Sequence, residues 1–140
     1  MRVPLRGCDL FFRKRLSIVM TLLFLLFVKH AVADLWLQTY HCGSRKDLYW
    51  GGHRHYGEHA VLTALVCVLF VPVHLALLSA LFDWICHWHI DHFKTRLVLR
   101  WGLGRSSAEF WRIQTVDQIL HYSTYFGIVL LLQWITLSSS

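Results

Sequence analysis

The segment 60–90 is predominantly apolar, and it constrains the fold of this chain more than any other feature of the sequence. It is longer than the roughly 20 residues that carry one helix across a bilayer, so it predicts either one span with a tail or two helices that fold back on each other. Pro72 lies near its middle and lacks an amide hydrogen, which favours a helical hairpin that turns near residues 70–74. The first arm, at about 12 residues, would need to be tilted, partly re-entrant or packed against other helices.

The amino-acid composition indicates a membrane protein. Hydrophobic residues make up 56% of the 140 residues and charged residues only 16%, with a mean hydropathy of +0.45. A water-soluble globule of this composition would expose much apolar surface. The formal net charge is +6, but the basic residues flank apolar segments instead of forming a stripe. This pattern favours membrane lipid with anionic headgroups as the partner and argues against nucleic acid.

The N-terminal apolar segment, residues 13–39, has two interpretations. Its apolar body at 16–28 follows three consecutive basic residues, and the AVAD motif after it resembles a signal-peptide cleavage site behind Ala33. Apolar character resumes at once in residues 35–37, which gives enough length for a membrane span. The span is the favoured interpretation.

The predicted fold is an all-α, polytopic transmembrane helical bundle of about four helices. The last apolar segment covers 113–137, and the polar stretches 40–58 and 95–112 are predicted to be loops. The predicted organisation is a basic N-terminal extension at 1–15, a single transmembrane helical domain at 16–137 and a tail at 138–140. In an up-down-up-down bundle, the ends of helices one and three and the starts of helices two and four lie at the same membrane face.

Histidine and aspartate recur four positions apart at the helix ends that this topology brings together. The three i, i+4 pairs are His30 and Asp34, His87 and Asp91, and Asp117 and His121, and His59 opens the second helix. Residues four apart project from one face of a helix, so both members of a pair can hold one ion or each other. Three such pairs on three helices predict one clustered site.

These residue types suit one or two divalent metal ions, with zinc, iron or manganese as candidates. Neutral imidazoles bind such ions, carboxylates offset their charge and can act as general bases, and a bound water is acidified toward neutral pH. All seven residues are therefore predicted metal ligands, and Asp34, Asp91 and Asp117 are also predicted catalytic groups. Gln38 and Gln118 are predicted to form hydrogen bonds to the ligand residues and so to orient them.

Two lysines near the pairs have two interpretations. Lys46 and Lys94 are either interfacial anchors that reach the lipid headgroups or binding groups for an anionic substrate such as a phosphate.

The remaining histidines carry less weight as ligands. We expect His41, His53 and His55 to be solvated in a polar loop, His74 to lie in the hairpin turn, and His89 and His92 to project away from the ligand face. The loop sequence GGHRHYGEH could also offer a surface metal site.

A structural alternative stays open beside the metal centre. A histidine and an aspartate four residues apart can form a hydrogen-bonded pair that joins helices without a metal. An ionised aspartate deep in lipid would cost about 2.5–3.5 kcal/mol, which favours pairing or metal binding without deciding between them.

The order and spacing of these residues also resemble a family of small integral-membrane proteins from bacteria and phages, grouped as domain of unknown function 3307. The resemblance rests on HAVADLWLQT at 30–39, Lys46, His59, HWHIDHFK at 87–94 and DQILH at 117–121. It implies that the seven candidate ligands form one motif set with Gln38, Lys46, Lys94 and Gln118. The basic N-terminal extension and the additional His89 and His92 depart from the pattern. The resemblance implies a residue set and no reaction, because the family has no established activity.

The leading expectation for function is a metal-dependent membrane hydrolase that acts on a lipid-linked or phosphorylated substrate. The alternative is a non-enzymatic membrane protein whose His/Asp pairs form a structural polar network or a path for protons or ions. A third expectation, interference with a host membrane partner by a phage protein, has no sequence pattern of its own. Basic residues are more numerous on the predicted site face than before Leu16, which favours a cytoplasmic site in a bacterial inner membrane.

Overall fold

The structure is a computed structural model that describes residues 6–37, 46, 48 and 52–138. Its elements are α1 (Arg6–Ala31), a π-helical segment η1 (Val32–Leu37), α2 (His53–Cys67), α3 (Val73–Arg100) and α4 (Ala108–Ser138). The described residues contain no strand, and the predicted all-α fold is confirmed.

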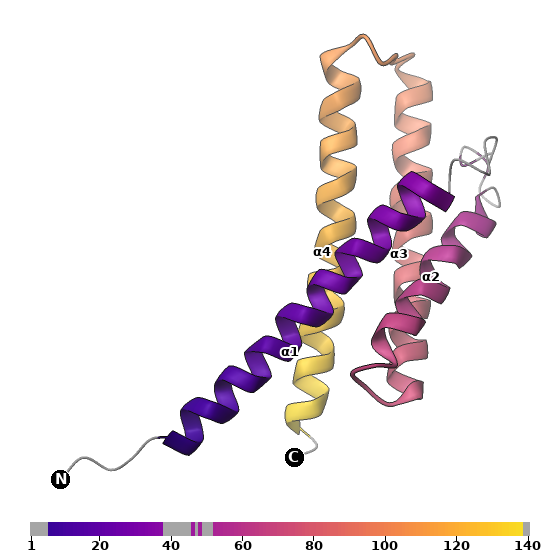
Figure 1. Ribbon diagram of the computed structural model, residues 1–140. Helices are drawn as coiled ribbons and strands as arrows, with labels where there is room; N and C mark the ends of the chain where they lie inside the picture. The colour runs from indigo at the N-terminus through magenta and orange to yellow at the C-terminus, as the bar shows by residue number, and fades with distance from the viewer. Residues whose placement is uncertain (1–5, 38–45, 47, 49–51, 139–140) are drawn as a thin grey trace.

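The predicted hairpin is also confirmed, because α2 ends at Cys67 and α3 begins directly after Pro72 (Figure 1). Pro72 has φ −55° and ψ 149°, a conformation that interrupts a helix, and its carbonyl accepts hydrogen bonds from the amides of Leu75 and Ala76. With 15 residues, α2 is about 22 Å long, which is shorter than the hydrocarbon core of a bilayer.

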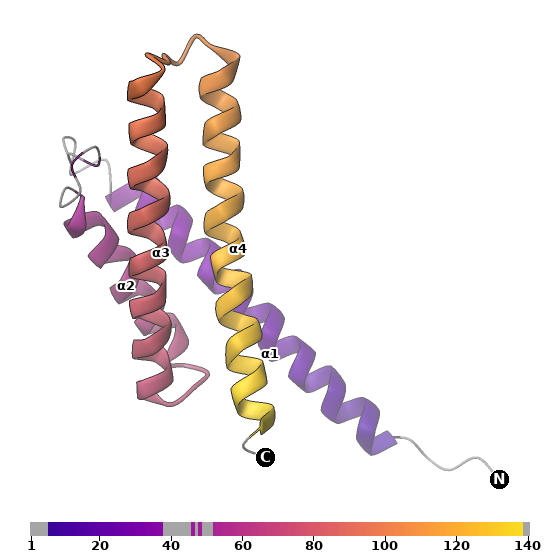
Figure 2. The same ribbon diagram turned by 180° about the vertical axis from the view of Figure 1, so that it is seen from behind.

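The four helices run up, down, up and down, as predicted. Helices α3 and α4 form a long antiparallel hairpin, α2 lies beside α3, and α1 crosses the bundle obliquely (Figures 1 and 2). The start of α1, the end of α4 and the turn between α2 and α3 therefore lie at one end of the molecule. The connection between α3 and α4 lies at the opposite end.

Helices α3 and α4 extend further than the sequence predicts. The loop predicted at 95–112 is wrong, because only residues 101–107 connect the two helices. Arginine is a strong helix former, so the basic residues Arg96 and Arg100 continue α3 instead of ending it. Gly102, with φ 60°, takes the left-handed conformation that commonly follows a helix end.

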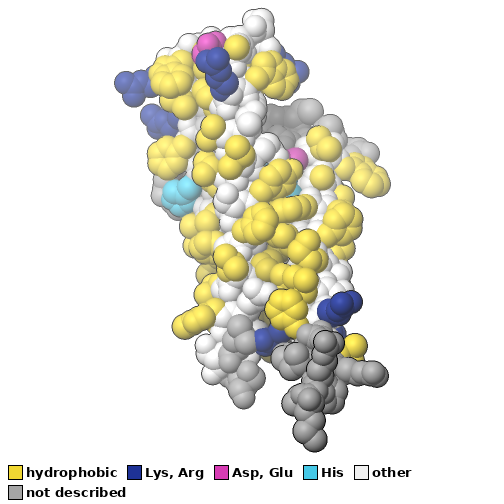
Figure 3. Space-filling model, turned by 90° about the vertical axis from the view of Figure 1, so that its left-hand side faces the viewer, with side chains coloured by type: hydrophobic (Ala, Val, Ile, Leu, Met, Phe, Trp, Pro, Cys, Tyr) yellow, Lys and Arg dark blue, Asp and Glu magenta, His cyan; other side chains and the backbone are white. Residues whose placement is uncertain are grey.

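The face that carries α1 and α4 is apolar between two basic ends (Figure 3). Figure 3 shows a broad band of hydrophobic side chains on the face that carries α1 and α4, with Lys and Arg side chains at both ends of the band. Within the described residues, three segments are long and apolar enough to cross a membrane: Phe12–Leu37, Val73–Arg100 and Ala108–Thr136. These features are consistent with a multi-pass membrane protein.

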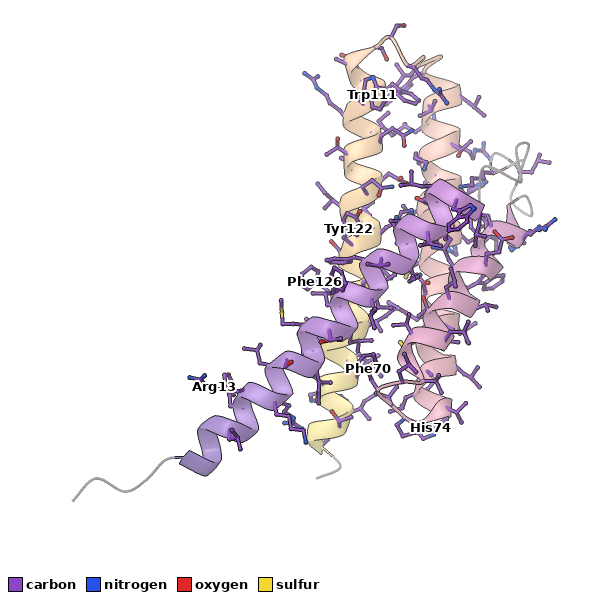
Figure 4. All side chains as sticks on the ribbon, viewed as in Figure 1. Arg13, Phe70, His74, Trp111, Tyr122 and Phe126 are labelled. Carbon is purple, nitrogen blue, oxygen red and sulfur yellow. The ribbon has the colours of Figure 1, made fainter. Side chains whose placement is uncertain are left out.

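The apolar core lies in the half of the bundle near the α2–α3 turn. Leu26, Tyr125 and Ile128 are almost completely buried there, and Phe70 of the turn packs against the same cluster. Figure 4 places Phe70 at this end of the molecule and Trp111 at the other. The buried polar residues gather next to this core, on the side of the α3–α4 connection.

Candidate metal centre

The structure brings all seven predicted ligand residues into one buried cluster. His30 comes from α1, Asp34 from η1, His59 from α2, His87 and Asp91 from α3, and Asp117 and His121 from α4. Six of these residues are at most 2% exposed, while the Asp34 side chain is 22% exposed. The nitrogen–oxygen distances within the three pairs are 3.3 Å for His30–Asp34, 3.9 Å for His87–Asp91 and 3.6 Å for His121–Asp117.

His87 lies at the centre of the imidazole rings. Its ring centroid is 3.7 Å from that of His59 and 4.0 Å from that of His121, to which it is stacked in parallel. The His30 centroid follows at 5.5 Å. Within the described part of the chain, neither ring nitrogen of His87 has a hydrogen-bond partner. Buried polar atoms normally have partners, so these two nitrogens point to a ligand that the cluster can bind.

His55 also belongs to the cluster, and the prediction that it is solvated is wrong. Helix α2 begins at His53, inside the stretch predicted to be a loop, and this buries His55 to 2% exposure. The Nε2 atom of His55 lies 3.2 Å from Asp34 Oδ1, and the same oxygen accepts a hydrogen bond from His59 Nε2 at 3.1 Å. His55 and His59 are themselves four residues apart, and this spacing was the signal that could have found His55.

The donor atoms fall into three overlapping groups, within each of which all atoms lie within 4.8 Å of one another. The groups are His30, Asp34, His59 and His87; His55, His87 and Asp91; and Asp91, Asp117 and His121. We call His30, Asp34, His55, His59 and His87 the histidine-rich half of the site. The remaining ligand residues and their lysine partners, Asp91, Asp117, His121, Lys46 and Lys94, form the lysine–carboxylate half.

Both lysines bind carboxylates of the cluster. Lys46 Nζ lies 2.5 Å from Asp91 Oδ2, and Lys94 Nζ lies 2.8 Å from Asp91 Oδ1 and 3.0 Å from Asp117 Oδ2. Their side chains are only 10% and 18% exposed. The two ammonium groups therefore face the carboxylates of the cluster.

His30 is oriented by residues on α4. Its Nε2 lies 3.3 Å from the carbonyl oxygen of Gln118, as predicted for a supporting residue, and its Nδ1 lies 2.9 Å from the Tyr125 hydroxyl. An Nε2–H would donate to Gln118 while Nδ1 accepts from Tyr125. If His30 held a metal through Nε2, its Nδ1–H would donate to the Tyr125 oxygen instead. The contact of Tyr125 with the site was not predicted, although Tyr125 follows His121 by four residues. Gln38, the other predicted supporting residue, lies outside the described residues.

The site has a small net charge that a metal ion would reverse. Burial lowers the pKa of His59 to about 3 against the opposing effect of its hydrogen bond to Asp34, so this imidazole is neutral at physiological pH. Apart from the histidines, the three aspartates and two lysines carry a formal net charge of −1. A divalent cation would convert this formal charge to +1.

A second buried polar group, absent from the sequence predictions, lies below the cluster. Asp83 precedes His87 by one turn of α3, and its Oδ2 is 2.6 Å from Lys29 Nζ. The Thr63 hydroxyl donates to the same oxygen at 2.6 Å, and Lys29 also donates to the carbonyl of His59 at 3.3 Å. The ion pair thus connects α1 to α3 directly beneath the candidate ligands.

The other described histidines belong to none of the three donor groups. His89 is exposed, His92 is buried beside the carbonyl of Lys46, His53 is half-buried at the start of α2, and His74 is exposed in the first turn of α3. Helix α3 begins at Val73, so His74 belongs to its first turn and not to the connection before it, where it was predicted. Figure 4 shows His74 at this end of the molecule. His41 lies outside the described residues.

The four helices reach the cluster in two different ways. Helix α1 with η1 ends there and α2 begins there, as predicted. Helix α3 instead continues from Asp91 to Arg100, and α4 begins at Ala108, well before Asp117. The prediction that the site lies at the ends of all four helices is therefore wrong for α3 and α4, which pass through it and extend beyond it.

Comparison with known proteins identifies the family. The sequence profile of the family described as Protein of unknown function (DUF3307) matches residues 22–140. The chain belongs to this family. The matched region contains every residue of the cluster, including both lysines. No curated protein and no solved structure matches the chain significantly.

Proposed function

We propose that this chain is a multi-pass membrane metalloenzyme that hydrolyses a lipid-linked or phosphorylated substrate. The observation that carries the proposal is the buried position of His87, whose two nitrogens have no hydrogen-bond partner among the described residues, inside a ring of histidines and carboxylates. Such a mixture of neutral imidazole and carboxylate donors fits zinc, iron or manganese.

The histidine-rich half fits a metal ion better than the lysine–carboxylate half. Asp34 is its only carboxylate, and its donors His30, Asp34, His59 and His87 lie close enough to share one ion, with His55 beside them. In the lysine–carboxylate half, the ammonium groups of Lys46 and Lys94 already neutralise Asp91 and Asp117. A divalent ion supplies an acidified water and polarises a phosphoryl oxygen.

The lysine–carboxylate half would bind and activate the reactants. Lys46 and Lys94 offer two ammonium groups to the oxygens of a phosphate, in place of part of their contact with Asp91. Asp91 lies 3.9 Å from His87 and is placed to accept a proton from the attacking water as general base. The greater number of basic residues on this side of the bundle supports a site that faces the cytoplasm from a bacterial inner membrane.

A second candidate function is a non-enzymatic polar network. It is favoured by the ion pairs of Lys46 and Lys94, which offset the charges of Asp91 and Asp117 without a metal. In this case the same residues would fix helix packing or pass protons or ions.

Metal content decides between these two candidates. The chain would be purified in detergent without a nickel column and measured by elemental mass spectrometry beside His87→Ala and His89→Ala. We expect near-stoichiometric zinc, iron or manganese in the parent and in the His89 variant, because His89 is exposed and outside the cluster. The His87 variant should lose the ion while it stays folded. A parent that remains metal-free after incubation with each ion would overturn the proposal.

Removal of the Tyr125 hydroxyl should weaken metal binding without removing a ligand. Tyr125→Phe keeps the buried ring but deletes the oxygen 2.9 Å from His30 Nδ1. Loss of such a supporting hydrogen bond typically reduces metal affinity by about 10–100-fold. Competition with a fluorescent chelator measures the affinity, and Tyr122→Phe, which removes the hydroxyl of an exposed tyrosine on the same helix, serves as the control. Equal affinity in parent and Tyr125→Phe would contradict a supporting role of the Tyr125 hydroxyl.

A further inference from the structure

Helices α3 and α4 form a groove of about 480 Å³ on their side of the site, with an almost entirely apolar lining. Ile90 and Leu120 form its inner end, toward the middle of the bundle, and Trp101 and Arg112 form its outer end. The groove exists because both helices extend beyond the cluster. Only its outer part, with Leu97, Trp101 and Arg112, lies in the stretch predicted to be a loop.

The groove and the lysine–carboxylate half share two residues. Lys94 and Asp117 line the groove, and their side chains contact each other at 3.0 Å. Lys94 also binds Asp91, the proposed general base. A molecule in the groove would thus lie directly beside the candidate site.

The groove also spans the level at which the surface changes from apolar to basic. Val116 and Leu120 are exposed apolar residues of α4, whereas Arg112 is 78% exposed and lies about 7.5 Å nearer to the α3–α4 connection than Asp117. Trp101, at the same end, is exposed as well. Tryptophan and arginine favour the membrane interface, so the outer end of the groove lies at the depth of lipid phosphates and the inner end at the depth of their hydrocarbon chains.

We propose that this groove binds an anionic phospholipid, with one hydrocarbon chain along Val116 and Leu120 and the phosphate between Arg112 and Lys94. The occupant follows from charge and depth: the apolar lining suits a chain, and the two cations at and above the level of Asp117 suit an anion. The inference rests on the proposed function and names its substrate class, a membrane lipid with a terminal phosphate.

The binding test uses the full chain in detergent after removal of metal by a chelator. Native mass spectrometry would follow titration with phosphatidic acid, phosphatidylcholine and inorganic phosphate. We expect one phosphatidic acid to bind at least about tenfold more tightly than phosphatidylcholine, because the latter carries a choline cation next to its phosphate. Inorganic phosphate, which lacks the chain, should bind more weakly than phosphatidic acid.

Two variants and two matched controls locate the binding. Val116→Trp fills the middle of the groove and Arg112→Gln removes its outer cation, and each should weaken phosphatidic acid binding about tenfold. Leu130→Trp enlarges an exposed residue of α4 outside the groove, and Arg13→Gln removes a cation that Figure 4 places at the far end of the molecule. Both controls should bind like the parent.

Three outcomes would overturn the inference: equal binding of phosphatidylcholine, unchanged binding by both groove variants, or a dimer that Val116→Trp dissociates. The last would assign the groove to a second copy of this chain. Because the titration uses metal-free protein, its result is independent of metal content. If the chain binds phosphatidic acid but never takes up metal, the lipid site stands and the proposed hydrolase is wrong. If the chain takes up metal in the separate metal measurement but binds no lipid in the titration, the metal site stands and the lipid site is wrong.

Discussion

Replacement of Asp83 by alanine is expected to lower the free energy of unfolding by about 3–5 kcal/mol, since it leaves a buried charge without its partner. Lys29 is 4% exposed, and its ammonium group lies 2.6 Å from the Asp83 carboxylate. Thr63 loses its acceptor in the same variant, because its hydroxyl donates to Asp83 at 2.6 Å. The remaining described contacts of Lys29 are the carbonyl of His59 and the ring of Tyr125, and neither carries a compensating negative charge.

A double variant separates loss of the pair from loss of one partner. Lys29→Met with Asp83→Leu removes both charges and fills their space with apolar groups, so it should recover most of the stability lost by Asp83→Ala. Glu109→Ala is the control, because its contact with Arg112 is long, at 3.8 Å, and exposed, so it should change stability by less than about 1 kcal/mol. Unfolding can be followed by helical circular dichroism during denaturation in mixed micelles. A double variant as unstable as Asp83→Ala would show that the ion pair itself, and not an unpaired lysine, determines the loss.

The fold could be predicted where the sequence contains a local physical signal. Pro72 interrupts a long apolar segment, so the α2–α3 hairpin follows from backbone chemistry alone. The extent of α3 and α4 could not be predicted in the same way. Residues 95–112 are polar and basic, but polarity does not distinguish a loop from a helix that leaves the hydrocarbon region, and helix propensity there favours the helix.

The site could be predicted where its members are four residues apart, and less well where they meet only in three dimensions. The pairs His30–Asp34, His87–Asp91 and Asp117–His121 were visible because a helix places both members on one face. Lys29 and Asp83 are 54 residues apart, and their contact depends on how α1 crosses α3. No spacing within one helix specifies such a crossing.

The contact of Lys46 with the site is another feature that the sequence could not predict. It belongs to the polar stretch before α2, where a lysine is ordinarily solvated, yet it lies against Asp91 of α3 and is only 9% exposed. Its direction could be found only from the structure. Asp91 therefore has an ammonium group on each oxygen, and in the proposed mechanism it becomes available as a base when the phosphate of the substrate takes over part of these contacts.

Asp91→Asn is expected to have the largest effect on activity. Asparagine keeps the shape of the side chain but cannot accept a proton, and loss of a general base commonly reduces turnover by about 10²–10⁴-fold. The assay would measure phosphate release from phosphatidic acid in mixed micelles by the metal-loaded chain. The variant should still bind this lipid, because Arg112 and Lys94 are unchanged, and Arg13→Gln, at the far end of the molecule (Figure 4), should match the parent as the control.

The metal content of Asp91→Asn locates the ion within the cluster. If the histidine-rich half holds the ion, the variant keeps nearly the parent's metal content, because the donors His30, Asp34, His59 and His87 are intact. Loss of metal together with turnover would instead make Asp91 a ligand and contradict that location. The non-enzymatic polar network predicts a third result: no turnover in the parent and a lower unfolding temperature in the variant. In that case the substitution acts on stability, because Lys46 loses the carboxylate 2.5 Å from its ammonium group.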